Sequence, residues 1–257
     1  MQHTTVYISL NVVVDAGSKK VAERIIGMLH RKPKLILHDM ESLARGVTDF
    51  LDSDLLGFFR YSRHSYYGDS LFFISIVLHR LFTNTKRIIM LDSDLKFLTD
   101  IRQLWQQFDR FSDQNLVGIA REQQPTYRHV FSAYRSKHSD TTVGDPPPKG
   151  ITGFNSGVLL LNLESMRNSQ LYNSLLHFVS IERLASKYSF KGHLGDQDFY
   201  TLLSIDYPQL FFHLSCGWNR QLCVWWRDHG YADVFDSYWN CSQIVRVYHG
   251  NCNTEIP

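Results

Sequence analysis

Long apolar runs are absent from the 257-residue chain. The longest candidate, Leu71–Leu78, is far shorter than the roughly 20 residues that a helix needs to cross a bilayer. The first ten residues, MQHTTVYISL, lack the basic start and long apolar region of a secretory signal peptide. Runs of Lys or Arg are also missing, and the net charge is only +2. We therefore expect no membrane contact from this segment itself and no nucleic-acid partner.

Cysteine is scarce and is confined to the last quarter of the chain. The four residues are Cys216, Cys223, Cys241 and Cys252, and no two of them form a CxxC pair. The lack of such a pair argues against a zinc site. An even number of clustered cysteines favours two disulfides and a secretory compartment, with four free thiols as the alternative. Spacing alone allows three connectivities.

Short β-branched runs alternate with helical patterns along the chain, and 44% of the residues are hydrophobic. This alternation predicts an α/β domain with a mostly parallel sheet flanked by helices. Ligands of such sheets bind at the carboxyl ends of the strands. The predicted strands are Val6–Val14, Leu35–Leu37, Arg87–Leu91, Leu116–Ala120, Val158–Leu161 and Val245–Tyr248, and the predicted helices are Lys19–Leu29, Ser70–Leu81, Asp100–Phe108, Glu164–Lys187 and Phe199–Ser204.

The pentapeptide LDSDL occurs twice, and its two aspartates are a common way to hold a divalent cation. The first copy, Leu51–Leu55, follows a segment whose apolar spacing fits a helix. Residues i and i+2 of a helix point to different faces, so Asp52 and Asp54 would diverge. We predict that these two carboxylates are solvated and bind no metal.

The second copy, Leu91–Leu95, follows the predicted strand Arg87–Leu91. In extended backbone, residues i and i+2 project to the same side, so Asp92 and Asp94 can converge on one ion. Their place at the carboxyl end of a strand in an α/β fold supports a metal site. Capping of a following helix is the alternative.

A third ligand is needed because two carboxylates alone bind a hard cation loosely. His249 directly follows the predicted strand Val245–Tyr248 and is a candidate. Mixed oxygen and imidazole ligation favours Mn²⁺ over Mg²⁺ or Ca²⁺. A hydrogen-bonded structural histidine is the alternative.

Two polar segments could approach a ligand closely. Asn155, Ser156 and Gly157 precede the strand Val158–Leu161, where their small side chains would allow this approach or form an ordinary turn. The run GDQD, Gly195–Asp198, precedes the helix Phe199–Ser204 and is also what plain N-capping would produce.

In combination, these motifs resemble glycosyltransferase family 8. The order of the motifs is a strand-end DxD, then FNSGV, then GDQD, then HGN. The resemblance covers almost the whole chain from about Leu10 onward. It is carried by the runs RIIMLDSDLKF, GIAREQQPTYRH, VGDPPPKG, GFNSGVLLLNLESMR, GHLGDQDF, WNRQLCVWWRDHGY and YHGNCNTEIP.

The resemblance implies a single catalytic domain of GT-A type over residues 1–257, a Rossmann-like fold that binds a nucleotide-sugar. Since Val6–Val14 resembles the family's second strand, we expect the first strand to be lacking. By this resemblance the catalytic residues are Gln197 and Asp196. The implied metal ligands are Asp92, Asp94 and His249 around Mn²⁺, and the implied donor-binding residues are Ser93, Asn155, Ser156, Gly157, Gly195, Asp196, Gln197, Gly250 and Asn251.

The match is strongest to a xylosyltransferase branch of the family. It implies a retaining enzyme that moves xylose from UDP-xylose, in α-1,3 linkage, onto the xylosyl-glucose glycan of EGF-like repeats. It also implies the endoplasmic reticulum lumen and the disulfides Cys216–Cys241 and Cys223–Cys252. Two alternatives are a catalytically silent relative, lectin-like or scaffolding, and a family 8 transferase that uses another UDP-sugar. For the acceptor, Trp218, Trp225, Trp226 and Tyr127 are either core residues or stacking platforms.

Overall fold

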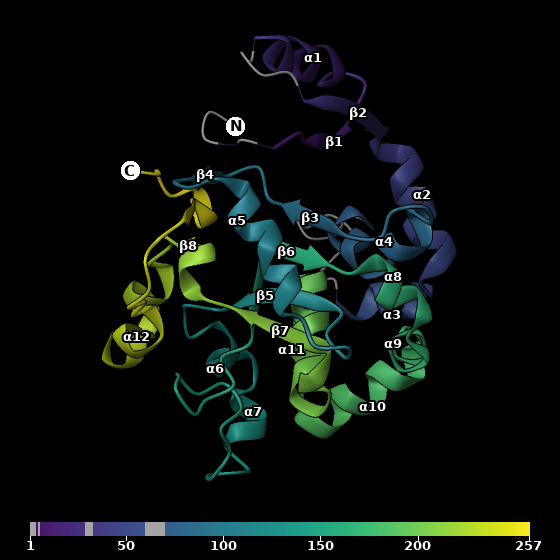
Figure 1. Ribbon diagram of the computed structural model, residues 1–257. Coiled ribbons are helices and arrows are strands. Elements are labelled where there is room, and N and C mark those ends of the chain that lie inside the picture. Colours follow the sequence, from purple (N-terminus) through teal and green to yellow (C-terminus); the bar gives the residue numbers. More distant parts are fainter. Residues whose placement is uncertain (1–3, 5, 29–32, 60–69) are drawn as a thin grey trace.

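A computed structural model describes residues 4, 6–28, 33–59 and 70–257 of the chain (Figure 1). The strands of the described residues form three sheets. The central sheet has the order β3-β6-β5-β7, a smaller sheet has the order β4-β9-β8, and β1 pairs with β2. The strands are β1 Ser9–Val14, β2 Lys34–Asp39, β3 Ile88–Leu91, β4 Leu95–Phe97, β5 Val117–Arg121, β6 Phe154–Leu161, β7 Phe211–Leu214, β8 Arg220–Gln221 and β9 Val247–His249.

The predicted α/β class is confirmed, but the prediction of mostly parallel pairing is wrong for the central sheet. Strand β6 runs antiparallel to both β3 and β5, whereas β5 and β7 are parallel. A strand-helix-strand crossover returns the chain in the same direction. Here the chain from β5 to β6 instead passes through two short helices, α6 Thr126–Val130 and α7 Ser132–Arg135, and a long loop. This connection lets β6 enter from the opposite end.

The helices that precede β5 largely follow the predicted pattern. Helix α1 covers Lys19–Gly27, and the predicted last residue, Leu29, lies outside the described residues. The predicted helix Ser70–Leu81 is a 3₁₀ turn, Ser70–Phe73, that leads into α4, Ile74–Leu81. The other helices of this part are α2 Met40–Phe50, α3 Ser53–Phe58 and α5 Ile101–Trp105, the last continuing as a 3₁₀ turn over Gln106–Arg110.

The single helix predicted over Glu164–Lys187 is wrong, because the segment forms three helices. These are α8 Leu163–Asn168, α9 Gln170–Leu175 and α10 Phe178–Tyr188. Ser169 separates the first two, since its side chain accepts a hydrogen bond from the backbone N–H of Tyr172. A serine that caps a new helix competes with continuation of the old one. The break allows α9 and α10 to turn around the lower end of α11, Asp196–Asp206 (Figure 1).

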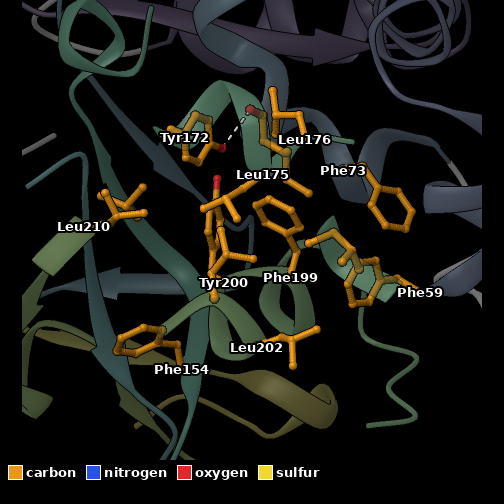
Figure 2. Close-up of a cluster of buried hydrophobic side chains, with 14 of the residues drawn as sticks. Phe59, Phe73, Phe154, Tyr172, Leu175, Leu176, Phe199, Tyr200, Leu202 and Leu210 are labelled. Atoms are coloured by element: carbon orange, nitrogen blue, oxygen red, sulfur yellow. Dashed lines mark hydrogen bonds between the residues drawn. The ribbon is translucent and has the colours of Figure 1, made fainter. Parts of the chain in front are cut away.

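Helix α11 lies at the centre of the main core. Its residues Phe199 and Tyr200 pack among aromatic and leucine side chains from the end of α3, from α9 and from the 3₁₀ turn before α4 (Figure 2). Tyr172 is also buried there, and its hydroxyl donates to the carbonyl of Ile76 at 2.9 Å. Burial on all sides fixes the start of α11, where the GDQD run lies.

The C-terminal part of the chain joins the small sheet to the rest of the molecule. Two disulfides, Cys216–Cys241 and Cys223–Cys252, are present, as the resemblance implies. They connect the segment around β8 with helix α12, Ala232–Trp239, and with the turn after β9. None of the described helices is long and apolar enough to cross a membrane. The remaining 3₁₀ or π turns cover Pro208–Leu210, Cys216–Trp218, Arg227–Tyr231 and Asn251–Asn253.

Candidate active site

The second LDSDL leaves the central sheet and enters the small one. Strand β3 ends at Leu91, and the N–H of Asp92 donates to the carbonyl of Gly157 at 3.0 Å. Strand β4 then begins at Leu95, which lies opposite His249 in the antiparallel pair with β9. The N–H of Gly250 donates to the carbonyl of Asp94 at 2.8 Å. This pairing brings the two aspartates to a histidine that is 157 and 155 residues away from them in sequence.

The three predicted metal-ligand residues therefore lie together. His249 Nε2 is 3.5 Å from Asp92 Oδ2 and 3.5 Å from Asp94 Oδ1. One ligand atom from each residue lies within 4.8 Å of the other two. Adjacent ligands of an octahedral ion at about 2.1 Å are about 3 Å apart, so this spacing suits a small divalent cation. The histidine is buried, whereas both carboxylates are open to solvent and to a ligand.

His249 is held so that one ring nitrogen faces the carboxylates. Its other nitrogen, Nδ1, lies 2.9 Å from Oδ1 of the buried Asn219. With the proton on Nδ1, the lone pair of Nε2 points at the space between the aspartates. Burial lowers the pKa of His249, which favours the neutral imidazole that a metal requires.

The first LDSDL is placed differently. Asp52 precedes helix α3 as its N-cap residue, and Asp54 lies in its first turn. Both side chains are exposed. Among the described residues, Asp92, Asp94 and His249 form a metal-type cluster, and neither Asp52 nor Asp54 belongs to one. The placement agrees with the prediction that this copy is solvated, although the residues lie at the start of a new helix and not on a continuing one.

The FNSG run is a buried part of strand β6 and not a turn before it. Asn155 and Gly157 are buried, and a Cβ added at Gly157 would lie 2.3 Å from Cε1 of His249. The absence of a side chain at Gly157 therefore allows the imidazole to lie against the strand. The Asn155 amide continues the network, since Asn219 Nδ2 donates to its Oδ1 at 2.8 Å.

The GDQD run starts helix α11 and presents three buried polar side chains. Gln197 Oε1 accepts from the N–H of Ser156 at 3.3 Å, which joins α11 to β6. Asp196 accepts from the hydroxyl of Ser75 at 2.5 Å. Asp198 is fully buried and accepts from Tyr127 and from the backbone N–H of Leu194. Burial raises the pKa of Asp196 to about 7 and that of Asp198 to about 6.

Three buried polar residues of the site were not singled out from the sequence. Glu122 is 2% exposed and follows β5 directly, so the strand-end rule that selects Asp92 would also have selected it. Burial raises the pKa of Glu122 to about 7. Asn219 and Ser75 carried no comparable signal, because a lone amide or hydroxyl is common in any sequence.

The other predicted donor residues and aromatics occupy varied positions. Ser93 is exposed between the two aspartates. Asn251 Oδ1 accepts from the N–H groups of Leu222 and Cys223, so this side chain holds the turn after β9. Gly195 has a φ of 64°, a conformation that favours glycine at the start of α11. Of the aromatics, Trp218 and Tyr127 are buried core residues, Trp226 is partly buried and Trp225 is 49% exposed.

The raised pKa of Asp196 predicts a pH-dependent stability. Its folded-state value of about 7 lies above the unfolded value of about 4, so the fold favours the protonated acid. This contribution is complete below about pH 4 and is lost as the pH rises to about 7. We expect Asp196→Asn to flatten the decline of the unfolding free energy between pH 4.5 and 8 in EDTA, by up to about 1.4 kcal/mol per pH unit.

Urea unfolding of both proteins at several pH values measures this effect. Asp198 and Glu122 contribute slopes of the same sign and remain in the variant, so the decline should weaken and not vanish. Equal slopes in the wild type and in Asp196→Asn would show that Asp196 is not a buried acid with a raised pKa.

Comparison with solved structures identifies the fold class. The crystal structure of mouse Xyloside xylosyltransferase 1 in its apo form matches with a TM-score of 0.96 and 46% identity, over 100% of this chain and 90% of that chain. The galactosyltransferase LgtC, solved with donor and acceptor sugar analogs, matches with a TM-score of 0.51 at 16% identity, over 94% of this chain and 86% of that chain, which bears on the fold alone. The chain has the GT-A glycosyltransferase fold, as the resemblance implies.

Sequence comparison gives the family. The model described as Glycosyl transferase family 8 matches residues 24–228, so the chain belongs to glycosyltransferase family 8. It is 47% identical over 256 residues to Xyloside xylosyltransferase 1 of Mus musculus and of Homo sapiens, which includes 97% of this chain. It is 30% identical over 77% of its length to Xylosyl- and glucuronyltransferase LARGE1 of Gallus gallus, of which it covers 26%. The chain spans 65% of the length of the two xyloside xylosyltransferases.

Proposed function

We propose that the chain is the catalytic part of a retaining xylosyltransferase. It moves xylose from UDP-xylose, in α-1,3 linkage, onto the xylosyl-glucose O-glycan of EGF-like repeats. The observation that carries the proposal is the 47% identity to xyloside xylosyltransferases over nearly the whole chain. Residues 1–257 would form one domain that works in the lumen of the endoplasmic reticulum, a compartment that allows the two disulfides.

Asp92, Asp94 and His249 are the proposed ligands of Mn²⁺. Two carboxylates and one imidazole suit this ion better than Mg²⁺ or Ca²⁺, which prefer oxygen ligands alone. When bound, the ion would act as a Lewis acid that stabilises the negative charge of the UDP leaving group. The orientation of His249 by Asn219 supports this role, because protein metal sites commonly fix their histidines in this way.

The donor sugar is proposed to lie between β6 and the start of α11. Ser156 is partly exposed on this part of β6, and Gln197 faces it from α11 by accepting from its N–H. Ser93, between the aspartates, would meet the ribose. The full set of proposed donor-binding residues is Ser93, Asn155, Ser156, Gly157, Gly195, Asp196, Gln197, Gly250 and Asn251.

We favour attack from the same face that the leaving group departs from. Retention otherwise needs a carboxylate nucleophile on the opposite face of the sugar. Asp198 is a poor nucleophile here, since it is fully buried and both of its oxygens accept hydrogen bonds. Asp196 is also buried and bonded to Ser75. In attack from the same face, the amide of Gln197 would stabilise positive charge at the anomeric carbon. The departing phosphate would take the proton of the acceptor hydroxyl.

Trp225 is the aromatic residue best placed for an acceptor sugar. Its ring stacks on His229 with centroids 3.8 Å apart and planes 10° from parallel. His229 Nδ1 lies 2.6 Å from the carbonyl of Trp225, which holds the pair together. The pair follows Cys223, whose disulfide to Cys252 anchors the segment beside the turn after β9. A fixed, exposed ring of this kind suits stacking on a sugar.

The test is transfer by this chain from UDP-xylose, UDP-glucose and UDP-galactose to a xylosyl-glucosyl EGF-like repeat, with Mn²⁺ or with EDTA. We expect UDP-xylose to be preferred by at least about 100-fold in kcat/KM and EDTA to abolish transfer. Preference for another UDP-sugar would contradict the proposed donor. A folded chain that binds Mn²⁺ and UDP but transfers nothing would instead be a silent relative.

A further inference from the structure

A chain of buried polar side chains connects Glu122 with His249. Glu122 Oε2 accepts from Nδ2 of Asn155 at 3.3 Å. Asn155 Oδ1 in turn accepts from Nδ2 of Asn219 at 2.8 Å. Asn219 Oδ1 lies 2.9 Å from Nδ1 of His249. All four residues are at most 7% exposed, so water cannot readily replace these contacts.

The direction of every hydrogen bond in this chain follows from groups that cannot change role, namely the Glu122 carboxylate, the backbone N–H of Gly157 and the backbone carbonyl of Asn155. An ionised carboxylate can only accept, whereas a side-chain amide has a donor end and an acceptor end. With Glu122 as acceptor, Asn155 turns its NH₂ toward Glu122 and its oxygen toward Asn219, and the N–H of Gly157, which donates to this oxygen at 3.2 Å, favours the same orientation. Asn219 Nδ2 also donates to the backbone carbonyl of Asn155 at 3.3 Å, so Asn219 turns its oxygen toward His249. His249 then carries its proton on Nδ1 and donates it to this oxygen, which leaves the lone pair on Nε2.

Glu122 also contacts the reacting end of the site. Gln197 Nε2 lies 3.5 Å from Glu122 Oε2, while Gln197 Oε1 accepts from the N–H of Ser156. The other oxygen of Glu122 accepts from the N–H of Gln124 at 3.1 Å. Both oxygens of Glu122 therefore accept from N–H donors. A side-chain amide at this position would place its own NH₂ against one of these N–H groups.

We propose that Glu122 is a positioning residue that, together with these backbone groups, sets the hydrogen-bond direction of Asn155 and Asn219 and thereby helps to hold His249 in the tautomer that can bind a metal ion. The inference rests on the proposed function only for the reaction that the ion serves. Glutamine in place of Glu122 keeps the shape but adds a donor that opposes the NH₂ of Asn155, so the contacts that hold the two asparagine amides in their orientation are weakened. The imidazole proton can then move to Nε2, where it blocks the ion.

The first test needs neither activity nor donor. Nitrogen-15 NMR of metal-free protein at pH 8, above the pKa of about 7 of Glu122, reports which nitrogen of His249 carries the proton. The expected result is Nδ1–H in the wild type and a substantial Nε2–H population in Glu122→Gln. Nε2–H in the wild type would overturn the proposal, even if the variant failed to fold.

The second test measures Mn²⁺ affinity by calorimetry with the full chain. We expect Glu122→Gln to weaken binding about 10- to 100-fold, as loss of an outer partner of a ligand does. Glu164→Gln, an equal change at an exposed glutamate that pairs with Lys86, should leave the affinity unchanged. A folded Glu122→Gln variant that binds Mn²⁺ within about twofold of wild type would contradict the proposal.

Discussion

Asp92→Asn is expected to lower kcat/KM for sugar transfer by about 10³-fold, with the fold intact. The side chain is about half exposed and faces His249 across 3.5 Å, so its exchange removes a charged ligand without opening the core. An amide oxygen is a weaker ligand for a divalent cation than a carboxylate. The loss of charge stabilisation on the leaving group then accounts for a factor of this size. Initial rates over a range of UDP-xylose and Mn²⁺ concentrations measure it.

Asp52→Asn is the matched control. It makes the same chemical change in the same pentapeptide, at a residue that has no side-chain capping hydrogen bond and lies in no metal-type cluster of the described residues. We expect its kcat/KM within about twofold of wild type, since changes at exposed sites are usually small. Comparable losses in both variants would mean that the two copies of LDSDL do not differ in function.

Gly157→Ala is expected to weaken Mn²⁺ binding about 10- to 100-fold, although alanine adds only one methyl group. The added Cβ would lie 2.3 Å from Cε1 and 2.6 Å from Nδ1 of His249, so the ring must move. That movement breaks the bond to Asn219 and carries Nε2 away from the aspartates. Strain in the packed strand should also cost about 1–3 kcal/mol of stability.

Gly57→Ala controls for the effect of replacing a glycine. A Cβ at Gly57, in helix α3, would meet nothing within 4 Å, and alanine favours a helix over glycine. Its Mn²⁺ affinity should match wild type, measured by the same calorimetry. Wild-type affinity in Gly157→Ala would show that His249 need not lie against β6 in order to bind the ion.

Local sequence distinguishes the two copies of LDSDL, because the first follows a helix and the second follows a strand. The run before the second copy is a short β-branched strand, and β3 indeed ends at Leu91. The run before the first copy has helical spacing, and α2 indeed ends at Phe50. The same strand-end reasoning predicts His249 as a metal ligand. Its distance from the aspartates could not be predicted, because it depends on β4, a strand of three residues with no signal of its own.

The failures arise where tertiary contacts outweigh local composition. The polar residues of FNSG look like a turn, yet Asn155 lies in a buried strand because its amide finds partners in Glu122 and Asn219. Ser169 lies within a helical sequence pattern, but its side chain caps the new helix α9. Glu122 directly follows a strand and could have been selected on that ground, but its contacts with Asn155 and Gln197 depend on the tertiary fold.

The most direct test of the account is to locate the metal. Crystals of the chain with Mn²⁺ and UDP, measured at the manganese absorption edge, reveal the ion by its anomalous scattering. We predict an anomalous-difference peak within bonding distance of Asp92, Asp94 and Nε2 of His249, and no such peak at Asp52 or Asp54. A peak that lacks His249, or one bound at the first LDSDL, would contradict it.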